Sequence, residues 1–143
     1  MTEAWEFVEG ATSDLAFEAR GATPEEAFSA SARALLAATV EDPGGVQPAE
    51  RRSLAFEEPD LDLLLLRFLN ELVYLRDAEE LLLLPEHLEI ERDGAARLRA
   101  AVVGERIDPA RHVLLAEVKA ATAHALRVAP AADGWLATAT LDV

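Results

Sequence analysis

Acidic residues at two distant points of the chain are the first candidates for chemistry. Asp14 lies where a polar turn enters a predicted strand, and Asp142 is the penultimate residue. Hard divalent cations bind several oxygen ligands, and carboxylates from separate segments commonly supply them. The two carboxylates, with the terminal carboxylate of Val143 or a backbone carbonyl, could therefore form a small oxygen cage. The alternative is a turn aspartate and a solvated terminal one, and spacing alone favours it because aspartate is common in turns.

A second group of candidate ligands consists of Glu105, Asp108 and His112. Asp108 and His112 are four residues apart, so on a helix both would face the same side and could bind one ion. Asp108 followed by Pro109 is also typical of a turn or a helix start, and this structural alternative is the stronger one.

Three more side chains are possible functional residues: Glu71, Lys119 and His124. Glu71 lies among leucines on a predicted helix, where a carboxylate needs solvent or a partner, and Lys119 is one such partner. Lys119 shares a predicted strand face with Glu117, and the simpler reading is that both coat the surface of a sheet. His124 falls on the apolar side of the same strand, where a histidine is more often a packed core residue than a catalyst.

Several kinds of site are excluded by what the chain lacks. It has no cysteine, which excludes a disulfide scaffold, a thiolate zinc site and a thiol nucleophile. The Pro43-Gly44-Gly45 stretch lacks the lysine and the serine or threonine that complete a phosphate-binding loop. The serines lack the surroundings of a nucleophile elbow. These motifs alone therefore indicate no particular reaction.

The charge of the chain limits its partners. Its 143 residues include 13 Lys and Arg against 27 Asp and Glu, which gives a net charge of −14. A surface this acidic repels phosphate backbones, which argues against direct nucleic-acid binding and favours a cation or a basic protein partner. Self-repulsion also opposes association, so we expect a monomer or a weak homo-oligomer.

Length and hydropathy predict a soluble, cytoplasmic protein with a single domain over residues 1–143. That length suits one compact domain of ~100–150 residues. The chain does not open with a basic segment followed by an apolar run, so no signal peptide is expected. The longest apolar runs are far shorter than the ~20 residues of a membrane helix, so no membrane association is expected.

The elements that would position these residues are two helices and several strands. Thr23-Pro24-Glu25-Glu26 predicts a helix start with a capping box, and Asp42 to Gly45 predicts its end. A wide apolar face predicts a second helix over residues 60–76. The remaining patterns predict an α+β fold, a two-layer sandwich in which a mixed or antiparallel sheet carries both helices on one face. The predicted strands cover residues 5–8, 15–20, 51–57, 81–91 (interrupted by Pro85), 95–103, 112–128 and 135–143.

Several motifs resemble those of the archease family. Gly104-Glu105-x-x-Asp108-x-x-x-His112 matches the family pattern G-E-x-x-D-x-x-x-H, and residues 117–124 match E-V-K-A-x-T-x-H. The Gly134-Trp135 pair and the ending Leu141-Asp142-Val143 match the family's G-W and closing L-D-[IV]. Residues 68–74, in the predicted second helix, resemble F-L-N-E-L-[LIV]-Y. The resemblance covers nearly the whole chain in the family's order.

The N-terminal motif departs from the family pattern. Archeases usually carry D-H-T-A-D before the second strand, and the matching stretch here is Gly10-Ala11-Thr12-Ser13-Asp14. The threonine and the second aspartate are retained, while Gly10 and Ala11 replace the first aspartate and the histidine. If that histidine serves the family's action, this chain lacks it, whereas Asp14 remains available for metal binding.

The resemblance implies an α/β protein that assists an RtcB-type RNA-splicing ligase. Such a ligase joins RNA ends with GTP and metal and attaches GMP to one of its own histidines. Archease promotes this guanylylation and repeated turnover, in tRNA splicing and RNA repair, as an activator and not as an enzyme. The resemblance also implies a divalent metal site at Asp14, Asp142 and the carbonyl of Val143, with Ca²⁺ expected and Mg²⁺ or Mn²⁺ as alternatives.

The acidic charge suggests how such an activator would work. A tip near Asp14 and Asp142 could enter the basic, metal-rich site of the ligase, or position a divalent ion there. Two alternatives stay open. The chain could be a chaperone-like binding module for another nucleic-acid enzyme, because its N-terminal motif has diverged. A less favoured alternative is a small metal-dependent hydrolase, which would need Glu105, Asp108 and His112 to converge in a pocket.

Overall fold

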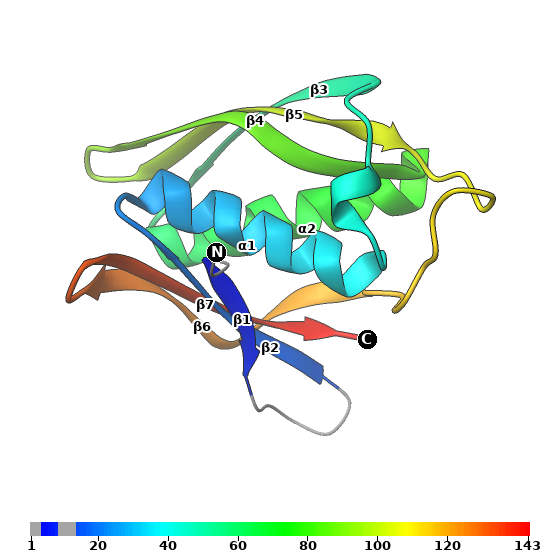
Figure 1. Ribbon diagram of the computed structural model, residues 1–143. Coiled ribbons are helices and arrows are strands. Elements are labelled where there is room, and N and C mark those ends of the chain that lie inside the picture. Colours follow the sequence, from blue (N-terminus) through cyan, green and yellow to red (C-terminus); the bar gives the residue numbers. More distant parts are fainter. Residues whose placement is uncertain (1–3, 9–13) are drawn as a thin grey trace.

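The computed structural model describes residues 4–8 and 14–143, which form seven strands, two α-helices and one short 3-10 helix. Figure 1 shows the helices lying between two groups of strands. In chain order the elements are β1 (Trp5–Val8), β2 (Asp14–Gly21), α1 (Pro24–Thr39), η1 (Pro43–Gly45), β3 (Glu50–Glu58), α2 (Leu61–Glu79), β4 (Leu81–Arg92), β5 (Ala96–Arg106), β6 (Ala120–Ala131) and β7 (Gly134–Asp142).

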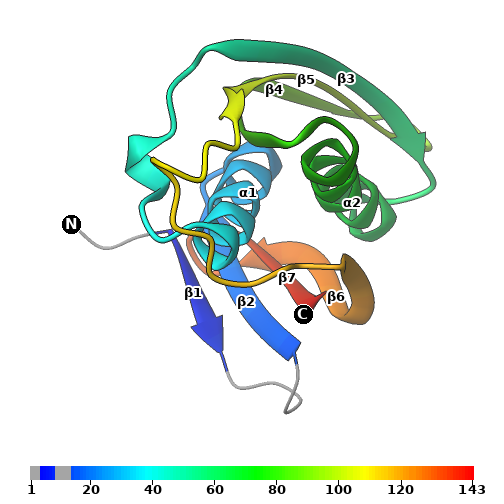
Figure 2. The same ribbon diagram turned by 90° about the vertical axis from the view of Figure 1, so that its right-hand side faces the viewer.

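The strands form two antiparallel sheets. One has the order β1-β2-β7-β6 and the other the order β3-β5-β4. Figures 1 and 2 both show α1 and α2 between the sheets, so each sheet carries the helices on one of its faces. The expected α+β class with two main helices and antiparallel strands is confirmed, but the strands form two sheets with the helices between them instead of the single sheet of a two-layer sandwich. The core fills the space between the layers, where the fully buried rings of Phe28 and Phe68 stack with centroids 6.0 Å apart.

Local signals in the sequence account for both helix starts. The Thr23 hydroxyl accepts the Glu26 N–H at 3.2 Å, and Pro24 is the first helical residue of α1, as predicted. The Glu26 carboxylate accepts the N–H of Ala22 at 2.7 Å, so it closes the cap one residue earlier than a standard capping box. At the start of α2, the Asp60 carboxylate accepts the Leu63 N–H at 2.9 Å.

The predicted strand over residues 112–128 is wrong in its first part. The chain between β5 and β6, residues 107–119, forms no strand, and β6 begins at Ala120. This connecting segment crosses the ends of the helices (Figure 2). Val113 and Leu115 form backbone hydrogen bonds at the end of α1, and the last residue of the segment, Lys119, forms one with a strand, β7. Val113 has β propensity, but the apolar residues Val113 to Leu115 are exposed, and Leu114 forms only an isolated bridge, to Val40.

Candidate functional site

Asp14 and Asp142 lie opposite each other in the sheet. β2 and β7 pair in an antiparallel register that begins at Asp14 with Asp142. Directly opposite residues of such a pair point to the same face, with Cβ atoms about 4.5–5.5 Å apart. Both residues are half-buried. The structure thus brings the first two predicted ligands together at one end of the sheet, while the turn before Asp14, residues 9–13, lies outside the described residues.

The chemistry of this pair suits a hard cation. Like charges directly opposite each other destabilise a sheet, and no Lys, Arg or His side chain in the described ranges forms an ion pair with either carboxylate. Val143 follows immediately in the chain, and its carbonyl is the third ligand that the family resemblance implies. Among the described residues, no group of three acidic or histidine side chains could hold a metal, so further ligands would be backbone oxygens or water.

The start of β6 is attached to this end of the sheet. The Lys119 N–H donates to the Asp142 carbonyl at 2.8 Å, and Ala120 pairs with Asp142 across the ladder. Asn70 on α2 binds both polar groups of Ala121: its amide donates to the carbonyl at 3.0 Å and accepts the N–H at 2.8 Å. Arg76, one and a half turns further along α2, donates to the Val118 carbonyl.

These contacts give positioning roles to residues that were not among the predicted ones. Asn70 and Arg76 fix the backbone that reaches Asp142, and they join the helix motif to the E-V-K-A motif in space. The sequence feature that could have identified them is a polar side chain within a leucine-rich helix, because a polar group that is buried against the protein needs a hydrogen-bond partner. Glu71 gave the same signal, but the amide beside it makes the contact.

Glu71 and Lys119 do not pair with each other. Within residues 4–8 and 14–143 neither side chain forms a hydrogen bond or an ion pair. Glu71 is half-buried and Lys119 is exposed, and the partnership that the sequence offered as one possibility is not formed. Lys119 still contributes its backbone N–H to the end of the sheet, and its ammonium group is free to meet solvent or a partner.

The expectation of a packed core histidine at position 124 is also wrong, because His124 is exposed. β6 carries a bulge between Thr122 and Arg127, where the register against β7 shifts. The bulge rests on two hydroxyl donors of β7: Thr138 donates to the Ala125 carbonyl at 2.6 Å, and Thr140 donates to the His124 carbonyl at 2.9 Å. The extra residues break the alternation that assigned His124 to the core face.

Glu105 and His112 form a buried hydrogen-bonded pair away from the two aspartates. His112 Nε2 lies 2.9 Å from Glu105 Oε1, and the two side chains are 2% and 11% exposed. His112 Nδ1 accepts the Asp108 N–H at 2.9 Å. Since a backbone N–H can only donate, the proton of the neutral ring is on Nε2 and faces Glu105. His112 therefore keeps no lone pair for a metal ion.

The Asp108 side chain does not join this pair. Its carboxylate accepts the Ala110 N–H at 3.0 Å and so caps the turn that carries His112. Glu105 instead binds Arg111 and the Gln47 N–H, the latter at 2.9 Å. The Arg111 guanidinium, followed by the Gln47 N–H, lowers the pKa of Glu105 from its ordinary 4.5 to about 2, against the opposing effect of burial. This arrangement fixes the loop after β5 and gives no support to a hydrolase.

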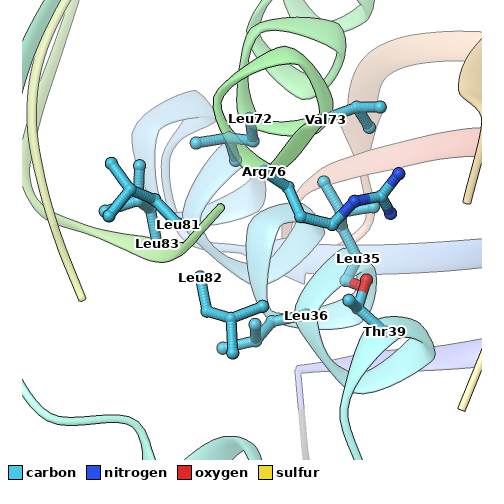
Figure 3. Close-up of a pocket in the computed structure, with 9 residues that line it drawn as sticks. All are labelled: Leu35, Leu36, Thr39, Leu72, Val73, Arg76, Leu81, Leu82 and Leu83. Atoms are coloured by element: carbon cyan, nitrogen blue, oxygen red, sulfur yellow. The ribbon is translucent and has the colours of Figure 1, made fainter. Parts of the chain in front are cut away.

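A small apolar cavity lies between α1, α2 and β4. Figure 3 shows the leucines gathered around it, with Arg76 and Thr39 on one side. Its volume of about 20 Å³ is close to the minimum for a single water, which is too little for a ligand. This cavity is therefore not a ligand site, and the candidate site remains the sheet end that carries Asp14 and Asp142.

Comparison with known proteins identifies the class of this α+β protein. The model of the Archease protein family matches residues 5–143. Protein archease of Thermococcus gammatolerans is 39% identical over 141 residues, covering 97% of this chain and 98% of the relative. Protein archease of Pyrococcus furiosus is 38% identical over 144 residues, covering 97% and 98%. The chain belongs to the archease family, as the motifs of its second helix and C-terminal half indicated.

Solved structures agree with this fold. Protein 1598 of Methanobacterium thermoautotrophicum, determined in solution, aligns with a TM-score of 0.85 at 29% identity, covering 99% of this chain and all of that one. A Thermotoga maritima crystal structure, described as an archease and possible chaperone, aligns with a TM-score of 0.63 at 20% identity over 92% of each chain. Among the described residues, neither helix has the length and hydropathy needed to cross a membrane.

Proposed function

We propose that this protein activates an RtcB-type RNA-splicing ligase by presenting a divalent cation, Ca²⁺ in the first instance, at the sheet end formed by Asp14 and Asp142. Membership of the archease family supports the choice of partner. The observation that carries the proposal is the register of β2 and β7, which sets the two aspartates directly opposite each other. The net charge of −14 suits an approach to a basic enzyme surface.

The cation would be held by the two carboxylates and the Val143 carbonyl. When bound, it would neutralise the paired carboxylates and leave coordination positions for groups of the ligase. The protein's own contribution is positional, because Asn70 and Arg76 hold the start of β6 and Lys119 holds the Asp142 carbonyl. No reaction of the protein itself is needed for this role.

Multiple-turnover RNA joining by the cognate ligase tests the proposal. We expect the wild-type protein to raise turnover in the presence of divalent metal, and the double variant Asp14→Asn, Asp142→Asn to lose this effect. Asp133→Asn is the matched control, because Asp133 is an exposed residue next to β7 at the opposite end of the strand. Equal activation by the wild type and the double variant would contradict the role of the aspartates.

Thermal unfolding measures the metal site separately. A cation that binds only the folded state at a concentration about 100 times its Kd stabilises by about 2.7 kcal/mol. We therefore expect Ca²⁺ to raise the unfolding temperature of the wild type and of Asp133→Asn, but not of the double variant, and a chelator to reverse the shift. An equal shift in all three proteins would place the ion elsewhere.

A chaperone-like module for another nucleic-acid enzyme is the second candidate. The replacement of the family's aspartate and histidine by Gly10 and Ala11 favours it, as does the description of the Thermotoga protein as a possible chaperone. It predicts no activation of an RtcB-type ligase, even with the aspartates intact. The turnover assay with the wild-type protein therefore distinguishes the two.

A further inference from the structure

Three consecutive large apolar side chains are exposed on the segment between β5 and β6. Val113, Leu114 and Leu115 are 58%, 51% and 59% exposed. Single exposed apolar residues are common on protein surfaces, but a contiguous run marks an interaction surface far more often. We call residues 113–115 the apolar strip.

Backbone hydrogen bonds hold the apolar strip in place. The Glu41 N–H donates to the Val113 carbonyl at 2.8 Å, and the Leu115 N–H donates to the Thr39 carbonyl at 2.9 Å, around a bridge between Val40 and Leu114. In this antiparallel pattern the N–H and C=O of Leu114 point away from α1. They have no hydrogen-bond partner among the described residues. The strip is therefore held in place, and its free backbone groups form an open edge. An extended segment of another chain can pair with this edge as an additional strand.

Residues of the strip also line a cleft that carries acidic side chains. Its volume is about 430 Å³, and Ile107, Leu114 and Leu115 are among its lining residues. Arg76 and Asp77, which are paired with each other, line it as well, together with Glu80 and Glu117. Among the described residues, neither of these two glutamates forms an ion pair. A lining of apolar and acidic side chains complements an apolar segment flanked by positive charge.

We propose that the apolar strip and its cleft dock an extended segment of the RtcB-type ligase in which apolar residues are flanked by Lys or Arg. This inference rests on the proposed function and names the surface by which the partner binds. The segment's backbone pairs with the free groups of Leu114, its apolar side chains enter the cleft, and its basic residues meet Glu80 and Glu117.

The position of the strip fits this role. Residues 115 and 119 are four residues apart, so at most about 14 Å of extended chain separates them. Lys119 bonds to the Asp142 carbonyl, and Figure 2 shows the connecting segment running from the helix ends towards the C-terminus. A ligase segment docked on the strip therefore brings the enzyme within reach of the two aspartates, so that docking and activation are separate contacts on one side of the protein.

Equilibrium binding to the purified cognate ligase, at matched salt concentrations, tests this surface. We expect the double variant Leu114→Ser, Leu115→Ser to raise the Kd at least about tenfold, because buried apolar anchors dominate binding. Leu63→Ser is the matched control: Leu63 is 39% exposed at the opposite end of α2, and its variant should bind like the wild type. Glu117→Lys should raise the Kd about threefold at low salt, with the difference disappearing at about 0.5 M salt.

The outcomes separate the two proposals. If the wild type binds and the double leucine variant binds equally well, the docking surface is wrong while the proposed function stands. If the wild type does not bind the ligase, both fail. Sedimentation of the protein alone tests whether a second copy of the chain binds the strip instead. A wild-type dimer, together with a monomeric double leucine variant, would assign the strip to this self-association and overturn the docking proposal.

Discussion

At the scale of single residues, Glu105 is an ionisable group with three hydrogen-bond partners. It accepts hydrogen bonds from Arg111, the Gln47 N–H and the Nε2 proton of His112, all on the side of the protein that carries the loop after β5. The neighbouring Gly104 allows β5 to lie against β4 here, because a Cβ at that position would be 1.6 Å from the Leu82 carbonyl oxygen. The conspicuous G-E pair is therefore explained by packing and loop fixation.

The lowered pKa of Glu105 predicts a specific dependence of stability on pH. Its folded-state pKa of about 2 lies below its ordinary 4.5, so its contribution is complete above pH 4.5 and disappears as the pH falls towards 2. We expect Glu105→Gln to lower the free energy of unfolding at neutral pH, and the difference from the wild type to shrink across this interval. Urea unfolding at a series of pH values measures it, with Glu117→Gln as an exposed control. A difference that stays constant over the whole series would contradict the assignment.

Asp14 and Asp142 became candidate ligands chiefly through the resemblance to the family, because spacing alone favoured a turn aspartate and a solvated terminal one. Each lies at the end of a strand, and the antiparallel register of β2 and β7 sets the two opposite each other. The predicted core position of His124 is wrong because a bulge in β6 inserts extra residues. Strict alternation of inward and outward side chains does not hold across such a bulge. The contact between Asn70 and Ala121 joins positions 51 residues apart. The sequence indicates that a polar amide in an apolar helix needs a hydrogen-bond partner, but it does not indicate which residue that partner is.

At the scale of elements, the bulge in β6 holds a residue in an unfavourable backbone conformation. Ala125 has a φ of 55°, in the left-handed region that costs an L residue roughly 1–2 kcal/mol. Hydroxyl groups of β7 stabilise the carbonyls of this bulge. The partner strand thus helps to fix the shape of β6.

This conformation predicts opposite effects for two glycine substitutions. Ala125→Gly relieves the positive φ, whereas Ala123→Gly, at an exposed position of the same bulge whose φ is not positive, only adds flexibility to the unfolded chain. We expect the Ala125 variant to be more stable than the Ala123 variant by about 1–2 kcal/mol. Thermal or chemical unfolding of the pair measures this difference. Equal destabilisation would mean that the bulge relaxes in solution to an ordinary conformation.

Elements were easier to predict than their arrangement. Both helices begin within one residue of the predicted positions, because caps are local signals. The division of the strands into two sheets depends on pairings such as β2 with β7, which join the two ends of the chain. Nothing in a single strand's pattern selects its partner. The part of the predicted strand that covers residues 112–119 is wrong for a related reason, since the apolar residues of this segment are exposed.

At the scale of the whole molecule, the net charge of −14 acts against compactness. Ion pairs such as those of Arg97 with Glu57 and Asp93 neutralise only part of the acidic surface. The remaining carboxylates repel one another over distances comparable to the screening length, which is about 10 Å at 0.1 M salt. Such self-repulsion destabilises a folded state while it favours encounter with basic partners.

This balance predicts that salt stabilises the protein at neutral pH. Raising NaCl from about 0.02 to 0.2 M shortens the screening length roughly threefold, so the unfolding temperature should rise. At pH 4.5 the net charge is close to zero, because the isoelectric point is about 4.5, and the same salt should then have much less effect. Calorimetry in chelator-containing buffer at both pH values separates this general screening from any cation at the two aspartates. A salt response of the same size at both pH values would show that specific ion binding, and not self-repulsion, controls stability.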